Sequence, residues 1–232
     1  MDSPYLARIQ AATALLLDDI APLGDADMAG PSLLPGWDRA MLLTHLAANA
    51  DGAWRGVTAA ARGEVGEVYP GGTEARNAEI EAGHGASADA LRQRLVAATA
   101  RLDAALAEAP DEAWHRKAVR PQGEVEVGNG LVVGRLREVL VHHVDLDIGY
   151  GPEDWPTAWV MEEMDRCMLD LPRRLPAGIA VVMESTDLGQ RWVAGSGDEV
   201  DIVGTSAQLF AWVTGRAPGV GEQDCPSLLP WR

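Results

Sequence analysis

The most informative segment of the chain reads Arg137-Glu138-Val139-Leu140-Val141-His142-His143-Val144-Asp145-Leu146. Together with its neighbours between residues 131 and 150, it has apolar side chains around most of a helical circumference, a pattern typical of a buried helix. The polar residues recur at spacings of three and four and form one narrow stripe. Because unpaired polar groups are unfavourable in a core, such a stripe needs polar partners or a metal ion.

Glu138 and His142 are four residues apart, which places both side chains on one helix face, one turn apart. A third ligand from another helix would give a nitrogen and oxygen donor set with an open position, as at a catalytic zinc ion. The spacing alone is weak, since roughly one such pair is expected by chance in this composition. Asp111 and His115 share the spacing within a polar segment, so we expect them at the surface. A solvated stripe on an ordinary amphipathic helix is the alternative explanation.

The composition describes an acidic chain with enough apolar residues for a large core. Its 232 residues are 47% hydrophobic, and 35 acidic against 19 basic residues give a net charge of −16. This charge argues against nucleic acid or an anionic membrane surface as the partner. No membrane span or secretory signal is recognisable, so we expect a cytoplasmic protein in which Cys167 and Cys225 are free thiols.

Helical periodicity predicts a bundle of four helices in the first part of the chain, with an interior suited to a metal site. Asp38 is a predicted N-cap, and His45 lies on the helix that it begins. Residues 63–85 are predicted to form a long connection that covers a site, and residues 121–130 a hairpin or loop. The four helices are expected at about residues 4–22, 38–62, 87–109 and 131–150.

The pattern changes after Gly149-Tyr150-Gly151-Pro152. Two helical segments enclose three short β-like runs, which predicts a small α+β domain. The expected domains are residues 1–151, a metal-binding four-helix bundle, and residues 152–232, the small domain; the fold class is α+β. The helices are expected at about residues 157–171 and 206–214, and the strands at 179–184, 190–194 and 199–203.

Several segments, taken together, resemble the mycothiol-dependent maleylpyruvate isomerase family, which belongs to the DinB-like metalloenzymes. Residues 35–51, with Pro-Gly-Trp-Asp-Arg and the later His-Leu-Ala, resemble its first helical signature. Residues 138–150, with Glu-Val-x2-His-His-Val-Asp-Leu, resemble its second. Residues 74–83, the pattern Trp212-x2-Gly215-Arg216 and the Leu-Pro-Trp ending are also similar. The resemblance covers nearly the whole chain.

The resemblance implies a DinB-like four-helix bundle followed by a small C-terminal α+β domain. It further implies a zinc ion held by His45, Glu138 and His142, mycothiol as a cofactor, and a catalytic role for Arg216. Without the resemblance, Arg216 is typical of a basic residue at a helix C-terminus, or of an arginine that binds a substrate carboxylate. His143 faces the apolar side and is predicted to be a packed core histidine, although it is the rival ligand.

The expected function is zinc- and mycothiol-dependent cis-trans isomerisation of maleylpyruvate to fumarylpyruvate by reversible thiolate addition to the double bond. The expected partners are a small dicarboxylate-type substrate and a low-molecular-weight thiol. One alternative is a zinc-dependent mycothiol S-transferase, which joins the thiol to an electrophile. The other is a non-catalytic metal-binding bundle, in which His143 or Asp145 would close the metal site.

Overall fold

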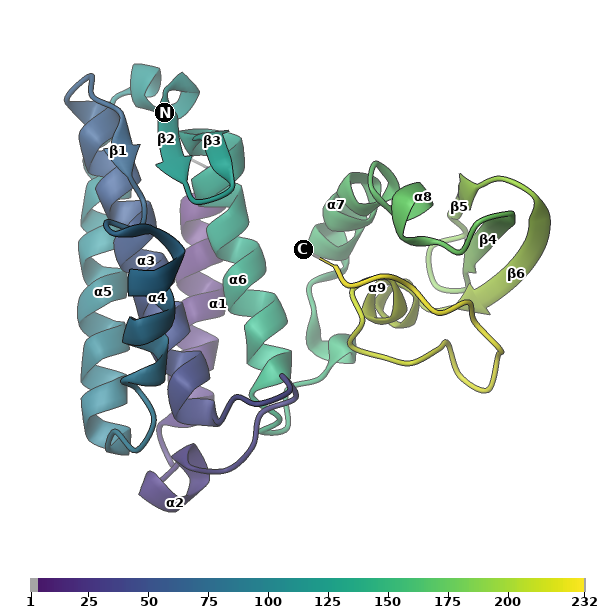
Figure 1. Cartoon of the computed structure of the whole chain (residues 1–232), viewed down its shortest axis with the longest axis horizontal. Coiled ribbons are helices and arrows are strands. Elements are labelled where there is room, and N and C mark those ends of the chain that lie inside the picture. The colour runs from purple at the N-terminus through teal and green to yellow at the C-terminus, as the bar shows by residue number, and fades with distance from the viewer. Residues whose placement is uncertain (1–3, 232) are drawn as a thin grey trace. The chain divides into compact units, whose positions relative to one another are not determined.

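A computed structural model describes residues 4–231, which divide into two compact units between Gly149 and Tyr150 (Figure 1). The first is helical with a small sheet, and the second combines helices with a three-stranded sheet, so the predicted α+β class is confirmed. Within residues 4–231, no helix is both long enough and apolar enough to cross a membrane.

The first unit is built on four long helices, as predicted. Helix α3 packs against α5 and α6, and α1 packs against the same two helices, so the four enclose one core. That core is mostly aliphatic, and Leu16, Leu42, Leu95 and Val139 are fully buried in it. The four helices are α1 (Pro4–Ile20), α3 (Arg39–Ala61), α5 (Ala88–Glu108) and α6 (Val133–Asp145).

Side-chain caps begin two of the bundle helices. The Asp38 carboxylate accepts a hydrogen bond from the Met41 backbone N–H at 2.7 Å, which confirms the predicted start of α3. Ser87 accepts from the Ala90 backbone N–H at the start of α5. Each cap satisfies a backbone donor that has no partner within the helix.

The predicted long connection over residues 63–85 is wrong, because this segment contains β1 (Gly66–Glu67) and α4 (Gly72–Glu81). Ile80 is the single fully buried residue of α4, so the helix has too few apolar positions to show a clear period. The end of α4 lies very close to α3: a Cβ at Gly83 would be 2.1 Å from Thr44 Oγ1. Helix α4 therefore flanks α3 beside His45.

Short elements connect the bundle helices of the first unit. Residues 121–130, predicted as a hairpin or loop, hold the turn and second strand of a hairpin and then a π-helical segment that leads directly into α6. Strand β2 pairs in parallel with β1 and antiparallel with β3. The elements are α2 (Asp25–Met28), η1 (Asp111–His115), β2 (Lys117–Arg120), β3 (Gly123–Glu126) and η2 (Val127–Val132).

The second unit matches the predicted order of helix, three strands and helix. Strand β4 lies between the other two, antiparallel to β5 and parallel to β6. An aromatic cluster fills its core, where the Phe210 ring lies 5.1 Å from Trp155 and 5.3 Å from Trp159. The elements are η3 (Pro152–Asp154), α7 (Thr157–Met168), α8 (Leu171–Arg174), β4 (Ile179–Ser185), β5 (Arg191–Gly195), β6 (Asp198–Gly204) and α9 (Ser206–Val213).

Candidate metal centre

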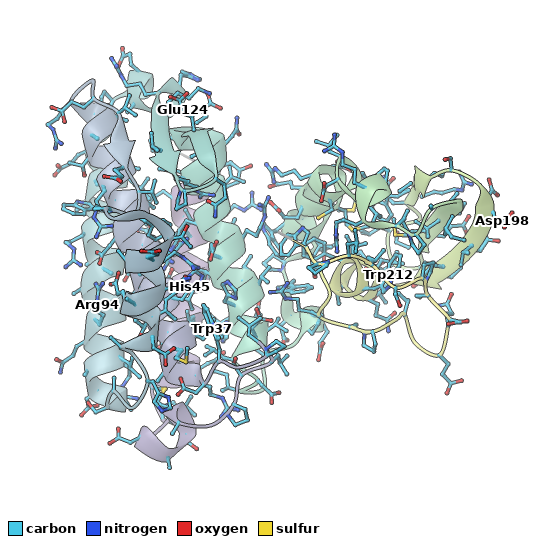
Figure 2. The ribbon with its side chains drawn as sticks, viewed as in Figure 1. Trp37, His45, Arg94, Glu124, Asp198 and Trp212 are labelled. Carbon is cyan, nitrogen blue, oxygen red and sulfur yellow. The ribbon has the colours of Figure 1, made fainter. Side chains whose placement is uncertain are left out.

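The structure brings His45 of α3 together with Glu138 and His142 of α6; Figure 2 labels His45 within the bundle. One potential ligand atom from each residue lies within 4.8 Å of the others. Glu138 Oε2 is 2.8 Å from His45 Nε2 and 3.3 Å from His142 Nε2. Within residues 4–231, no other group of three histidine, cysteine or acidic side chains is this close.

The polar stripe of α6 faces the protein interior, so the solvated-stripe alternative is wrong. Arg135 is buried one turn before Glu138 and donates hydrogen bonds to the Leu46 carbonyl at 2.7 Å and to Asn49 Oδ1 at 3.0 Å. Burial lowers the pKa of Arg135 to about 10, which still leaves the guanidinium charged at neutral pH. These bonds tie α6 to α3 next to the cluster.

Asp145 orients the imidazole of His142. Its Oδ2 lies 2.8 Å from His142 Nδ1, and its side chain is only 2% exposed. A carboxylate at this position accepts a hydrogen bond from Nδ1–H, and in the neutral ring this leaves the Nε2 lone pair directed at the cluster, as in many metal-binding histidines. Asp145 was predicted only as a candidate fourth ligand, although its spacing of three from His142 places both side chains on the same helix face.

His45 has a different environment on its second ring nitrogen. Arg76 of α4 places its guanidinium nitrogen 3.1 Å from His45 Nδ1. Arginine can only donate, so Nδ1 accepts in this arrangement and Nε2 donates to Glu138. The Trp37 ring meets the imidazole edge-on at 5.7 Å. Sequence reasoning missed Arg76, because it lies 31 residues from His45 in a segment predicted to be a loop.

The pKa values of His45, Glu138 and His142 are shifted in different directions. Burial lowers the pKa of His45 below its ordinary value, and the attraction of Glu138 does not offset this. Burial also disfavours charge on His142, but the hydrogen bonds and charges of Asp145 and Glu138 raise its pKa. Burial alone would raise the pKa of Glu138, but the two histidines hold it well below its usual range. Glu138 is therefore a carboxylate near neutral pH.

The donor set fits a divalent metal ion. Two ligands of a tetrahedral ion with bonds of ~2.1 Å are about 3.4 Å apart, close to the 3.3 Å between Glu138 and His142. The shorter 2.8 Å between Glu138 and His45 is a hydrogen-bond distance, so a bound ion would require these two groups to separate slightly. Two imidazoles and one carboxylate with an open fourth position form the ligand set of a catalytic zinc ion.

The other histidines lie outside the cluster. His143 is fully buried, as predicted, and its Nε2 is 3.0 Å from Asp19 Oδ2. His115 is exposed in η1, which confirms the predicted surface location of the second acid–histidine pair.

Arg216 lies in the second unit, just after α9. Its guanidinium donates to the Thr214 carbonyl at 2.8 Å, and its Cζ is 5.4 Å from the centre of the Trp231 ring. This position agrees with a basic residue at a helix C-terminus. Its catalytic role stays a prediction.

An open cavity of about 540 Å³ lies at the start of α3 within the first unit. It is lined by the segment that precedes α3 and by Met41 and His84. Trp37 lines this cavity, and its ring also meets the His45 imidazole edge-on.

Comparison with known proteins gives consistent results. A family described as the mycothiol maleylpyruvate isomerase N-terminal domain matches residues 9–147. The crystal structure of a mycothiol-dependent maleylpyruvate isomerase has a TM-score of 0.88 and 28% identity, over 98% of this chain and 95% of that chain. A histidine-to-alanine mutant of such an enzyme has a TM-score of 0.87 with the same identity and coverage. No curated protein sequence matches. The chain belongs to the mycothiol maleylpyruvate isomerase N-terminal domain family, as its sequence resemblance implied.

Proposed function

We propose that this protein is a zinc- and mycothiol-dependent isomerase that converts maleylpyruvate to fumarylpyruvate in the cytoplasm. The observation that carries the proposal is the convergence of His45, Glu138 and His142 in a chain of this family. A structure related at 28% identity over nearly all of both chains supports the same reaction.

His45, Glu138 and His142 would hold the metal through two nitrogens and one oxygen. When bound, zinc would supply the positive charge that favours deprotonation of a thiol, whose ordinary pKa is about 8.5. Asp145 fixes the ring of His142, and Arg135 anchors α6 to α3, so both helices present their donors in a defined geometry. These contacts limit the reorganisation that metal binding requires.

The thiol would supply the nucleophile, whose reversible addition to the double bond allows rotation from the cis to the trans isomer. We propose that the rest of the thiol occupies the cavity lined by Trp37, whose ring contacts His45. Arg216 is proposed to bind a substrate carboxylate or the enolate oxygen that develops during addition. This assignment rests on the sequence resemblance.

The test is conversion of maleylpyruvate by the purified, zinc-loaded protein with mycothiol, without thiol, and with glutathione as the control thiol. We expect fumarylpyruvate to form with mycothiol, and nuclear magnetic resonance identifies the trans product. A metal chelator should abolish conversion.

Two results would contradict the proposal. A stable thiol conjugate in place of fumarylpyruvate would identify an S-transferase. No conversion by protein that contains one zinc ion per chain would exclude the isomerase reaction. The assignment of the metal site would still hold in that case.

A further inference from the structure

Arg76 brings a positive charge to the edge of the proposed metal site without a carboxylate partner. Its guanidinium contacts His45 Nδ1 at 3.1 Å, Asn77 Oδ1 at 3.1 Å and the face of Tyr69, with Cζ 5.6 Å from the ring centre. Within residues 4–231, no acidic side chain lies within ion-pair distance of it. In a chain with 35 acidic residues, an arginine whose charge is unpaired beside a site is a candidate for binding an anion.

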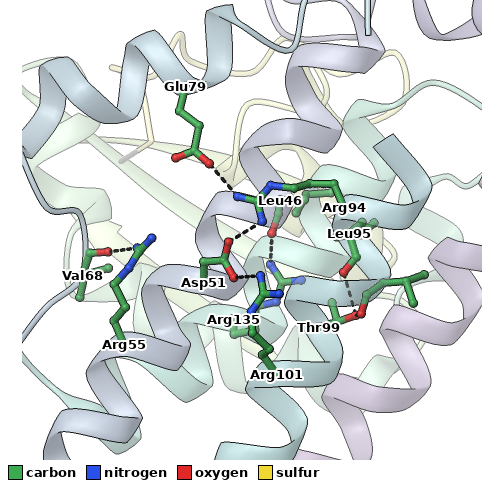
Figure 3. A network of polar contacts seen from close by, with 11 residues as sticks. Leu46, Asp51, Arg55, Val68, Glu79, Arg94, Leu95, Thr99, Arg101 and Arg135 are labelled. Atoms are coloured by element: carbon green, nitrogen blue, oxygen red, sulfur yellow. Dashed lines mark hydrogen bonds and ion pairs between the residues drawn. The ribbon is translucent and has the colours of Figure 1, made fainter. Parts of the chain in front are cut away.

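A network of ion pairs fixes the helix that carries Arg76 (Figure 3). Glu79, one turn after Arg76 on α4, pairs with Arg94 of α5 at 2.7 Å. Arg94 and Arg101 both pair with the buried Asp51 of α3 at 2.5 Å. The network joins α3, α4 and α5, so the position of Arg76 is set by the bundle.

The bond between Arg76 and His45 is incompatible with metal ligation by His45 through Nε2. A neutral imidazole that ligates through Nε2 carries its proton on Nδ1, which then donates instead of accepting. The guanidinium of Arg76 also donates only, so the two groups repel each other. Arg76 must therefore leave His45 when Nε2 becomes a ligand.

We propose that Arg76 is released from His45 by metal binding and then binds a carboxylate group of the substrate. This inference rests on the proposed function, in which the substrate is a dicarboxylate. The planar guanidinium pairs with a carboxylate through two parallel hydrogen bonds. Maleylpyruvate has a carboxylate at each end, and Arg76 would bind one of them.

Two binding measurements test this inference without turnover. Zinc affinity is measured by competition with a chromophoric chelator, and maleate affinity by calorimetry on the zinc-loaded protein. The variants are Arg76→Ala, Arg76→Lys, which keeps the charge, and Arg62→Ala. Arg62 is a matched control because it is exposed and pairs with Glu64 at the end of α3.

Arg76→Ala should bind zinc about 2- to 10-fold more tightly, because one competing hydrogen bond is removed. The same variant should bind maleate about 10- to 100-fold more weakly. Arg76→Lys should bind maleate with intermediate affinity, and Arg62→Ala should resemble the unmodified protein in both measurements. A residue that only supports the fold would not change the two affinities in opposite directions.

Weaker zinc binding by Arg76→Ala would overturn the inference, since Arg76 would then support the ligand. Equal maleate affinity with and without Arg76, or no maleate binding by the unmodified protein, would also overturn it. Failure of the proposed function gives a different result: maleate binding that depends on Arg76, in a protein that does not isomerise maleylpyruvate.

Discussion

Replacement of Asp145 by asparagine tests whether Asp145 orients His142, one of the proposed metal ligands. The Asp145 carboxylate lies 2.8 Å from His142 Nδ1 and is almost completely buried. Asparagine keeps the size of the side chain but removes the charge that stabilises the donating Nδ1–H tautomer. Loss of such an acceptor reduces metal affinity by about 10- to 100-fold, which corresponds to about 1.4–2.7 kcal/mol.

Zinc affinity of Asp145→Asn is measured by competition with a chelator of known affinity. Asp147→Asn is a matched control, because it makes the same change two residues away where the side chain is 62% exposed. Asp147 has a φ of 55°, a conformation that asparagine tolerates well. The Leu33 N–H donates to the backbone carbonyl of Asp145, a contact that does not depend on the side chain that is replaced.

We expect Asp147→Asn to bind zinc as tightly as the unmodified protein does. We expect Asp145→Asn to bind zinc more weakly than either. Equal affinity of all three proteins would refute the assignment of Asp145 as the group that orients His142. If zinc affinity fell equally in both variants, the cause would be the loss of one negative charge and not the orientation of His142.

Two further predictions concern the second unit and the ion-pair network. Arg216→Ala should retain zinc and lower turnover of maleylpyruvate by about 10²-fold or more, as for loss of a charged transition-state contact; unchanged steady-state kinetics would exclude its role. Asp51→Asn should lower the free energy of unfolding by about 1.5–3 kcal/mol at neutral pH, measured by urea denaturation. Burial alone would raise the pKa of Asp51, but Arg101 and Arg94 lower it, so this stabilisation is fully present above pH ~4 and is lost as pH falls through the lowered pKa. A difference between the two proteins that stays constant down to acidic pH would contradict this explanation.

The sequence predicted the bundle and the pair Glu138 and His142 because their signals are local or repeated. Helical periods recur over long segments in α1, α3, α5 and α6, and Asp38 is a strong capping signal. The spacing of Glu138 and His142 follows directly from helix geometry. His45 had no such local signal, and its assignment depended on the family resemblance.

The sequence did not predict helix α4, the contact between Arg76 and His45, or η2. The following reasons account for these differences. Helix α4 is largely exposed and follows Gly71, which has a φ of 81°, so its sequence resembles a loop. The pairing of Arg76 with His45 spans 31 residues and depends on how α4 packs on α3. The π-helical turn of η2, which shifts the start of α6 to Val133, likewise has no recognised sequence signature.

Whether His45, Glu138 and His142 form one metal site can be decided by measuring the metal content of the protein. Elemental analysis of the purified protein and of His142→Ala, after equal exposure to zinc and removal of free ions, measures the zinc bound per chain. We predict about one zinc ion per chain in the unmodified protein and almost none in the variant, because loss of one of three protein ligands leaves a weak site. Full zinc occupancy in folded His142→Ala would contradict the assignment of these three residues to one metal site.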